Sequence, residues 1–406
     1  MNQSYQGKIT TSIKYVVIAM SMMVAVSASQ ADVSQKKIGD LEIYKAAEGG
    51  KVTIMMMLDT SGSMTQTERS LTSSACDLPS GITSKTTDYT SSYDNSNTNP
   101  SYKRYYCTGK QDNKKYYDRL TRLKDAIFTL MDNTSLDSSK VSVGIGQFSS
   151  QSDSSNTLGT PDGRSGKIVV PAGLLTKEQR TLIKNEVAKM IGGNGTPTAN
   201  AYAESGAYML ATNTTNSSYS DYSGFDRSVS SSKNNLVYKS PLTGLTGQCN
   251  GQGIYFLTDG YPNSSGSNIA NTLMSKSLNV TSISPDTGLI NVKTGNDEAT
   301  VKAWDYIGAY AKKLRDTANP IRMTIKTATV GFGSEFNNPN GLPTKKVTIG
   351  GEEVNVTDCD QLSAQDAINL CKWGEKSYNY GEGGFYSAQS DTDVVDSIKQ
   401  FVGDLN

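Results

Sequence analysis

The apolar run from Val52 to Leu58 ends directly in Asp59-Thr60-Ser61-Gly62-Ser63. An almost continuous apolar run of this length is typical of a strand buried on both faces, as in a parallel sheet. In open α/β sheets, ligands bind beyond the carboxyl ends of the strands. Asp59, Ser61 and Ser63 alternate along the turn and offer hard oxygen donors that can point at a single hard cation. The same residue types also build Asx turns and helix caps that bind no metal.

Two later segments place further oxygen donors at strand or helix ends. The loop from Gly192 to Thr198 precedes a predicted helix from Ala199 to about Leu210, with Thr196 as the N-cap and Pro197 as the first helical residue. The apolar strand from Gly253 to Thr258 ends in Asp259-Gly260. Taken singly, Thr196 is only a helix cap and Asp259 only a turn residue. Taken together, the segments predict one metal site formed by Asp59, Ser61, Ser63, Thr196 and Asp259.

This order of elements resembles the von Willebrand factor A (vWA) domain with its metal-ion-dependent adhesion site (MIDAS). The resemblance implies that the hydroxyls of Ser61, Ser63 and Thr196 coordinate the cation directly, with Asp59 and Asp259 often acting through water. The expected cation is Mg²⁺, with Mn²⁺ or Ca²⁺ as alternatives, because all the donors are oxygens. A dication held by so few carboxylates keeps positive charge and an exchangeable position, which suits a carboxylate supplied by a partner.

Composition argues against several other classes of function. The chain has 406 residues, with 39 basic and 39 acidic side chains, so it has no charge bias toward nucleic acid. It contains no histidine, which excludes Ser-His-Asp and Cys-His triads and histidine zinc sites. No G-x-x-x-x-G-K-[ST] motif occurs. We therefore expect a binding protein and no enzyme. The enzyme alternative, a metal-assisted hydrolase, lacks an identifiable general base.

The first 31 residues have the pattern of an export signal. Lys8 and Lys14 precede the apolar stretch from Tyr15 to Val26, and the small residues Ser29 and Ala31 follow it. This pattern predicts a secretory signal peptide over residues 1–31, cleaved after Ala31. The alternative is an uncleaved anchor, although about a dozen apolar residues are few for a membrane span. No other segment is long and apolar enough to be transmembrane, and residues 32–50 form a lead-in.

Five cysteines in an exported chain are candidates for disulfides. The economical pairing joins Cys76 to Cys107 and Cys359 to Cys371. Cys249 is then left over and is free, buried or paired with another chain. Other connectivities of the five cysteines remain open.

The remaining pattern predicts a doubly wound α/β fold over residues 51–406, with a mostly parallel sheet flanked by helices, as in vWA and Rossmann-like domains. Long polar insertions interrupt it at about residues 65–117, 212–250, 261–299 and 334–380. The first insertion is rich in tyrosine. Its tyrosines either form an adaptable contact surface or hold the insertion together as a small core. We expect strands at 52–58, 141–148, 167–170, 253–258, 323–330 and 384–388, and helices at 118–131, 177–191, 199–210, 301–317 and 391–405.

A narrower resemblance is to the PilC/PilY family of type IV pilus tip adhesins. It is carried by the segments from Asp40 to Ala47, from Leu58 to Met64, and from Gly384 to Ala388 followed by a helix. The resemblance covers the A-domain half of that family, whose second half is a β-propeller with a calcium loop; no such loop occurs here.

This resemblance implies an exported adhesion module in the periplasm or at the cell surface, at a pilus tip. Its expected partners are a protein or surface ligand that offers a carboxylate, and minor pilins. The alternative from another class is a structural, assembly or force-sensing module whose metal only stabilises it. Loss of binding on chelation distinguishes adhesion from assembly.

Overall fold

The computed structural model divides the chain into two compact units, Met1–Gly50 and Lys51–Asn406, and describes parts of the second. The predicted signal peptide and lead-in, together with Cys76 and Cys249, lie outside the described residues. The described residues are 51–66, 89–95, 99–109, 115–154, 157–243, 250–259, 262–291, 302–333, 336, 341–388 and 390–405.

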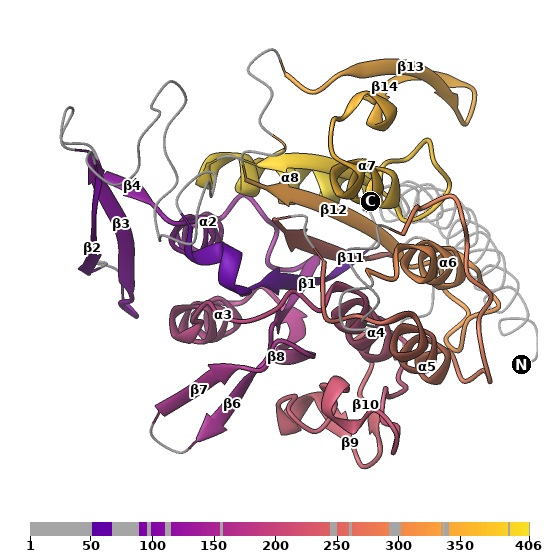
Figure 1. Cartoon of the computed structure of the whole chain (residues 1–406), viewed down its shortest axis with the longest axis horizontal. Coiled ribbons are helices and arrows are strands. Elements are labelled where there is room, and N and C mark those ends of the chain that lie inside the picture. Colours follow the sequence, from indigo (N-terminus) through magenta and orange to yellow (C-terminus); the bar gives the residue numbers. More distant parts are fainter. Residues whose placement is uncertain are drawn as a thin grey trace, which may run out of the picture. The chain divides into compact units, whose positions relative to one another are not determined.

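A six-stranded sheet forms the centre of the second unit (Figure 1). β1 is buried at every position, which fits its place inside the sheet and the apolar run that forms it. All neighbouring strands are parallel except β8, which runs antiparallel to β5 at one edge. The prediction of a mostly parallel α/β sheet is therefore confirmed. In spatial order the strands are β15 (Glu382–Ala388), β12 (Lys326–Phe332), β11 (Gly251–Thr258), β1 (Val52–Asp59), β5 (Val141–Phe148) and β8 (Gly166–Leu174).

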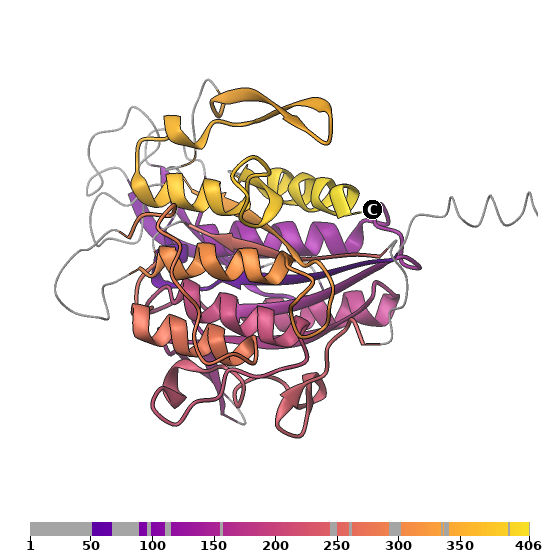
Figure 2. The ribbon, with the colours of Figure 1, turned by 90° about the vertical axis from the view of Figure 1, so that its right-hand side faces the viewer.

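Helices cover both faces of the sheet, because successive side chains of a strand point to opposite sides (Figure 2). Ile54 and Met56 of β1 pack with α2 (Arg119–Asp132), α3 (Lys177–Lys189) and α8 (Asp391–Leu405). Met55 and Met57 belong to the core on the other face, with α4 (Thr198–Met209), α5 (Ser267–Ser277), α6 (Trp304–Arg315) and α7 (Gln365–Gly374). Among the described helices, none combines the length and apolar character needed to cross a membrane.

The predicted insertions contain ordered elements that the sequence analysis did not identify. Helix α5 lies within 261–299 and buries Ile269, Leu273 and Met274, and α7 lies within 334–380 and buries Leu370 and Trp373. Among the described residues, three small antiparallel sheets lie within the insertions, and a fourth, at residues 151–161, lies outside them. They are β2 (Tyr89–Asn95), β3 (Lys103–Gly109) and β4 (Lys115–Tyr117); β6 (Gln151–Ser154) and β7 (Thr157–Pro161); β9 (Lys233–Asn234) and β10 (Val237–Tyr238); and β13 (Thr344–Ile349) and β14 (Glu352–Thr357).

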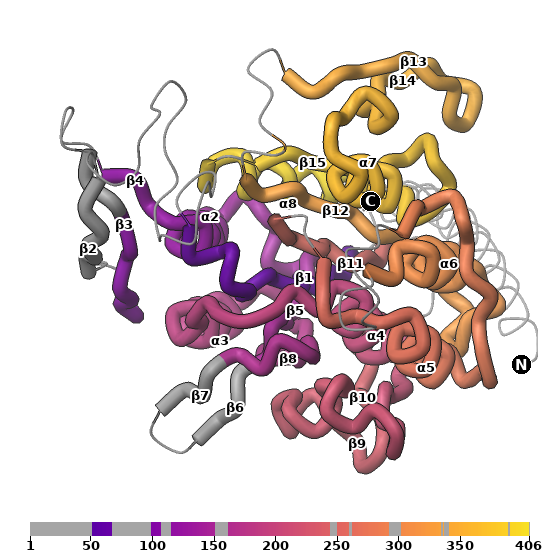
Figure 3. The backbone as a smooth tube through the Cα atoms, in the orientation of Figure 1, coloured from indigo at the N-terminus to yellow at the C-terminus, as the bar shows by residue number. Residues whose placement is uncertain are grey.

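Strands β3 and β4 of the tyrosine-rich insertion lead directly into α2 (Figure 3). Tyr102 is buried and donates a hydrogen bond to Asp125 of α2. Arg104 pairs with Asp125 at 2.6 Å and stacks on Tyr117, with its guanidinium carbon 4.1 Å from the ring centre. Tyr105, in contrast, is 49% exposed. The small-core alternative therefore describes Tyr102 and Tyr117, while half of the Tyr105 surface is exposed.

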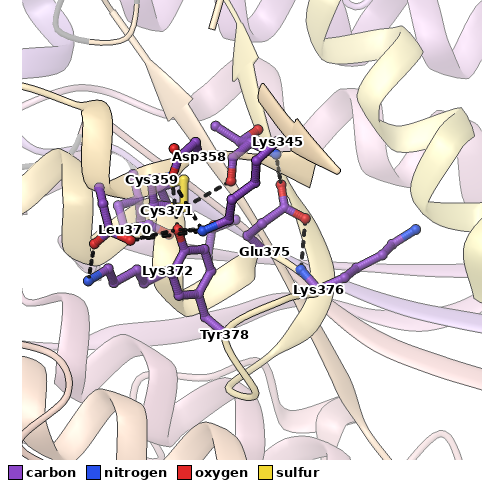
Figure 4. Close-up of a disulfide and its surroundings, with 12 residues drawn as sticks. Lys345, Asp358, Cys359, Leu370, Cys371, Lys372, Glu375, Lys376 and Tyr378 are labelled. Carbon is purple, nitrogen blue, oxygen red and sulfur yellow. Dashed lines mark hydrogen bonds and ion pairs between the residues drawn. A yellow bond between two sulfur atoms is a disulfide. The ribbon is translucent and has the colours of Figure 1, made fainter. Parts of the chain in front are cut away.

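The predicted disulfide between Cys359 and Cys371 is confirmed (Figure 4). It joins the short 3₁₀ helix η6 (Cys359–Gln361) to α7, with the two Cα atoms 5.6 Å apart. Tyr378 lies beside it and accepts a hydrogen bond from Lys345 at 2.8 Å. The disulfide and this contact together attach the end of the β13–β14 hairpin to the core.

A buried carboxylate, Glu204 of α4, attaches the insertion that follows this helix. Its Oε2 accepts hydrogen bonds from Thr214 Oγ1 at 2.7 Å and from the Gly224 amide at 2.8 Å, and its Oε1 accepts one from the Tyr238 hydroxyl. The pKa of Glu204 is raised to about 7, chiefly by burial and slightly by the Asp226 carboxylate, although these hydrogen bonds oppose the rise. The carboxyl group is thus easier to keep buried when it is protonated.

We expect Glu204→Gln to change how stability depends on pH. The folded pKa is raised to about 7, so the stabilisation from the bound proton is complete below the unfolded pKa and is lost as pH rises through the folded pKa. Between about pH 5 and about pH 7 the wild type should lose roughly 2 kcal/mol relative to the variant, as measured by urea unfolding. Glu186→Gln, which changes a carboxylate paired with Lys189 at 2.6 Å, serves as the control. Parallel pH curves for wild type and Glu204→Gln would contradict this prediction.

Candidate metal site

The Asp59-x-Ser61-x-Ser63 turn arranges its three polar side chains through local hydrogen bonds. Asp59 is the last residue of β1, and its Oδ1 accepts a hydrogen bond from the Ser61 amide at 2.8 Å. The chain then enters the 3₁₀ helix η1 (Gly62–Thr65), which is anchored by the buried Met64. The hydroxyl oxygens of Ser61 and Ser63 lie 3.0 Å apart. The turn therefore presents one carboxylate and two adjacent hydroxyls, as the sequence predicts.

Asp259 joins this group because β11 is the parallel neighbour of β1. Leu58 is paired with Leu257, so both strands end at the same level of the sheet. The hydroxyl of Thr258 donates to Asp59 Oδ2 at 2.7 Å, and the Asp259 amide approaches the same oxygen at 3.4 Å. Asp59 is fully buried and Asp259 is 2% exposed. Two buried carboxylates thus lie side by side at the carboxyl edge.

The loop that carries Thr196 lies against the first turn. The Gly62 amide donates to the Asn194 carbonyl at 2.9 Å, and the Gly193 amide donates to the Thr60 carbonyl at 3.0 Å. These reciprocal backbone bonds fix the glycine-rich loop directly beside Ser61 and Ser63. Thr196, which follows it, is 3% exposed. The fold therefore gathers the three predicted segments at one edge of the sheet.

The predicted N-cap role of Thr196 is wrong. Helix α4 begins at Thr198, and its N-cap is Pro197, which makes no side-chain cap bond. The reason is that the backbone of Thr196 pairs with another loop. Its amide donates to Asn263 Oδ1 at 2.8 Å, and its carbonyl accepts from the Asn263 amide at 2.9 Å. Thr196 thus belongs to the loop that pairs with Asn263 and not to helix α4.

The electrostatics of the site are dominated by the two carboxylates and one arginine. Burial and, to a smaller extent, the adjacent Asp259 carboxylate together raise the pKa of Asp59 to about 7, although hydrogen bonds from Ser61 and Thr258 oppose the rise. Arg119 Nη1 lies 3.5 Å from Asp259 Oδ2 and donates to the Ser63 carbonyl at 3.2 Å. A cation near both carboxylates would offset their mutual repulsion and favour their ionised forms.

The donors fit a hard dication. All five predicted residues offer oxygen, and only two of them are carboxylates. Among the described residues, no group of three or more Asp, Glu, Cys or His side chains is arranged so that it could hold a metal ion. The site is therefore distinguished by its hydroxyls, a composition that favours Mg²⁺ or Mn²⁺ with open coordination positions over a closed acidic calcium cage.

Three residues that position the site were not identified from the sequence. Arg119 is the first residue of α2, where a basic side chain opposes the helix dipole, and this unusual placement is a signal that an acidic partner lies nearby. Asn263 lies within a polar stretch with no comparable signal. Asp162 directly follows β7, and its Oδ1 accepts hydrogen bonds from the amides of Ser150 at 3.2 Å and Arg164 at 2.9 Å. These hydrogen bonds order the loop around Asp162, which lies next to the glycine-rich loop that carries Thr196.

Comparison with known proteins gives structural matches only. No family model matches the chain, and no curated protein matches it. The pilus adhesin SpaC from Lactobacillus rhamnosus GG matches at 12% identity and a TM-score of 0.40, over 88% of this chain and 30% of SpaC. The PilB minor pilin from Streptococcus sanguinis matches at 13% identity and a TM-score of 0.40, over 88% of this chain and 63% of that protein.

The von Willebrand factor domain of the type V pilus tip protein Mfa5 from Porphyromonas gingivalis matches at 10% identity and a TM-score of 0.31, over 88% of this chain and 96% of that domain. The chain spans about a third of the length of SpaC. Similarity at this level does not establish a shared function.

Proposed function

We propose that this chain is an exported, cation-dependent adhesion module of a type IV pilus system. In this proposal a divalent cation, Mg²⁺ or Mn²⁺ or Ca²⁺, is held at a MIDAS formed by Asp59, Ser61, Ser63, Thr196 and Asp259. The bound cation supplies a Lewis-acidic position that accepts a carboxylate from a protein or surface ligand. Minor pilins are the expected neighbours in the assembled pilus.

One observation supports the proposal: three segments far apart in the sequence, which contain five oxygen-bearing residues, meet at the carboxyl ends of β1 and β11. The Asp259 amide lies 3.4 Å from Asp59 Oδ2, both carboxylates are buried, and the hydroxyls of Ser61 and Ser63 are 3.0 Å apart. Following the vWA resemblance, the hydroxyls of Ser61, Ser63 and Thr196 would coordinate directly. Asp59 and Asp259 would act mainly through water and balance the charge.

The proposed role is binding rather than catalysis. The chain has no histidine, and the pKa of Asp59 is raised in a position where hydrogen bonds already occupy both of its oxygens. A carboxylate held in this way orients the site and is poorly placed to take a proton from a substrate. A partner carboxylate completing the coordination of a dication needs no such proton transfer.

Thr196→Ala tests the proposal on whole cells. The substitution removes one proposed metal ligand and no described side-chain hydrogen bond, so we expect a normal fold, normal pili, and adhesion reduced as far as a chelator reduces it in the wild type. Thr176→Ala is the matched control. Thr176 caps α3, where its hydroxyl accepts from the Gln179 amide at 3.3 Å. The preceding residue, Leu175, bonds to the Val141 carbonyl at the start of β5, so Thr176 lies at the opposite end of the strands from the metal site. Its loss should cost about 1 kcal/mol and leave adhesion unchanged.

Two results would contradict the adhesion role. The first is wild-type adhesion by Thr196→Ala cells, with and without chelator. The second is a loss of pili in that variant, which would favour the alternative of an assembly or force-sensing module. Counting pili by electron microscopy beside the adhesion assay separates these outcomes.

A further inference from the structure

Arg119 connects two of the three segments that form the candidate metal site. Its Nη1 donates to the carbonyl of Ser63 at 3.2 Å and lies 3.5 Å from Asp259 Oδ2. Its own amide donates to the Gln66 carbonyl at 2.8 Å, just after η1. The side chains of Arg119 and Asp259 are 8% and 2% exposed. The guanidinium is therefore a buried positive charge within the site.

The protein provides a fitted position for this guanidinium. Gly333, immediately after β12, has φ +143°, and a Cβ atom there would lie 3.0 Å from Arg119 Nε and 3.2 Å from its Cζ. Any larger residue at position 333 would press on the guanidinium as well as strain the backbone. Four distant parts of the chain thus meet at the Arg119 guanidinium. They are represented by Ser63, Arg119 itself, Asp259 and Gly333.

The placement of Arg119 opposes its local preference. It is the first residue of α2, at the positive end of the helix dipole, where a cation is disfavoured. A buried charge is also costly unless it is paired. Asp259 compensates both effects. In turn, Arg119 compensates part of the negative charge that Asp59 and Asp259 build up in the absence of a metal.

We propose that Arg119 is an internal counter-cation that weakens divalent-cation binding and leaves the loaded site positively charged toward its ligand. The inference depends on the proposed metal site and concerns its regulation. Two ionised carboxylates and one guanidinium leave a single negative charge, so a bound dication makes the site net positive. Without Arg119 the loaded site would be neutral. It would then bind the metal more tightly and attract the carboxylate of a ligand more weakly.

This proposal predicts opposite changes in two affinities, which a merely structural role would not produce. In the purified full chain, Arg119→Gln should bind Mn²⁺ about tenfold more tightly, as expected when one charge is removed within a few ångströms of the site. Isothermal calorimetry measures this. Acetate should bind the Mn²⁺-loaded variant more weakly than it binds the loaded wild type, as water-proton relaxation detects. In metal-free buffer the variant should melt at a lower temperature.

Two further variants keep the test interpretable. Arg119→Lys retains the charge and should keep Mn²⁺ affinity close to that of the wild type. Lys184→Gln removes a cation that pairs with Asp132 at 2.6 Å, at the far end of α2, and should change neither affinity. If Arg119→Gln fails to fold, the Lys variant still tests the charge, since a several-fold change in its Mn²⁺ affinity would contradict the proposal.

The outcomes separate this inference from the metal site. Equal or weaker Mn²⁺ binding by Arg119→Gln overturns the counter-cation role while leaving the site intact, provided that the wild type binds Mn²⁺ and Asp59→Ala does not. Absence of Mn²⁺ binding in the wild type and in all variants overturns both. Mn²⁺ binding that is detected only in the Arg119→Gln variant would support the counter-cation role most strongly.

Discussion

Asp59→Ala should abolish the stabilisation that a divalent cation gives to the folded chain. A metal that binds only the native state stabilises it by about 2.7 kcal/mol at a hundred times its dissociation constant. Wild-type melting should therefore rise with Mg²⁺ or Mn²⁺, and melting of the variant should not. Asp59 accepts hydrogen bonds from Ser61 and Thr258, so the variant will also be less stable without metal. The informative quantity is the change on adding metal, measured by differential scanning calorimetry.

Asp137→Ala is the matched control for this experiment. Its Oδ1 accepts a bond from the amide two residues on, that of Ser139, at 2.8 Å, which is the same local geometry as at Asp59. Asp137 lies just before the start of β5, at the opposite end of the strands from the metal site. Its loss should therefore leave the metal response intact. An equal metal response in wild type and Asp59→Ala would refute the assignment of the site.

Removing the disulfide between Cys359 and Cys371 should lower the free energy of unfolding by about 3 kcal/mol, the amount expected for closing a short loop. The two cysteines are twelve positions apart and fully buried. Without the bond, the unfolded chain gains freedom and η6 is no longer held against α7. Urea unfolding of the double variant, Cys359→Ala with Cys371→Ala, measures the loss.

Reductant supplies the control for the disulfide. Dithiothreitol should shift the unfolding midpoint of the wild type toward that of the double variant and should not affect the double variant itself. Equal midpoints for oxidised wild type and double variant would contradict the prediction. In that case the hairpin would be held by side-chain contacts such as that between Lys345 and Tyr378.

Much of the sheet could be predicted because β1 is an almost continuous apolar run, β11 contains the apolar run from Ile254 to Leu257, and β5 has apolar residues at alternate positions along its first part. The prediction of 141–148 coincides with β5, and 253–258 lies within β11. Helix α5 was missed because its apolar residues are few and are embedded among Ser and Asn. The same applies to α7, whose burial depends on tertiary contacts of Leu370 and Trp373 rather than on a long amphipathic pattern. Short helices with weak local signals are fixed by the surrounding core.

The oxygen donors of the site could be predicted from the sequence, but the residues that position them could not. Asp59 and Asp259 each end an apolar strand, a position that the sequence alone identifies. Arg119 and Asn263 act through contacts with residues that are distant in sequence, Asp259 and Thr196 respectively. No local pattern specifies such pairs. The mistaken N-cap role of Thr196 has the same origin, since a long-range pairing with Asn263 replaced the local preference.

Helix α4, which follows Thr196, has no exposed position along its whole length. Its small side chains allow close packing, and at Gly206 even one added methyl carbon would lie 2.0 Å from the Tyr310 hydroxyl oxygen. Few substitutions are compatible with such a helix. The insertion between α4 and β11 is held by buried residues such as Glu204, Phe225 and Tyr238, whereas outer residues such as Leu236, which is 79% exposed, are less restricted. Evolution can therefore diversify the outer surface of this insertion while the helix behind the metal loop remains fixed.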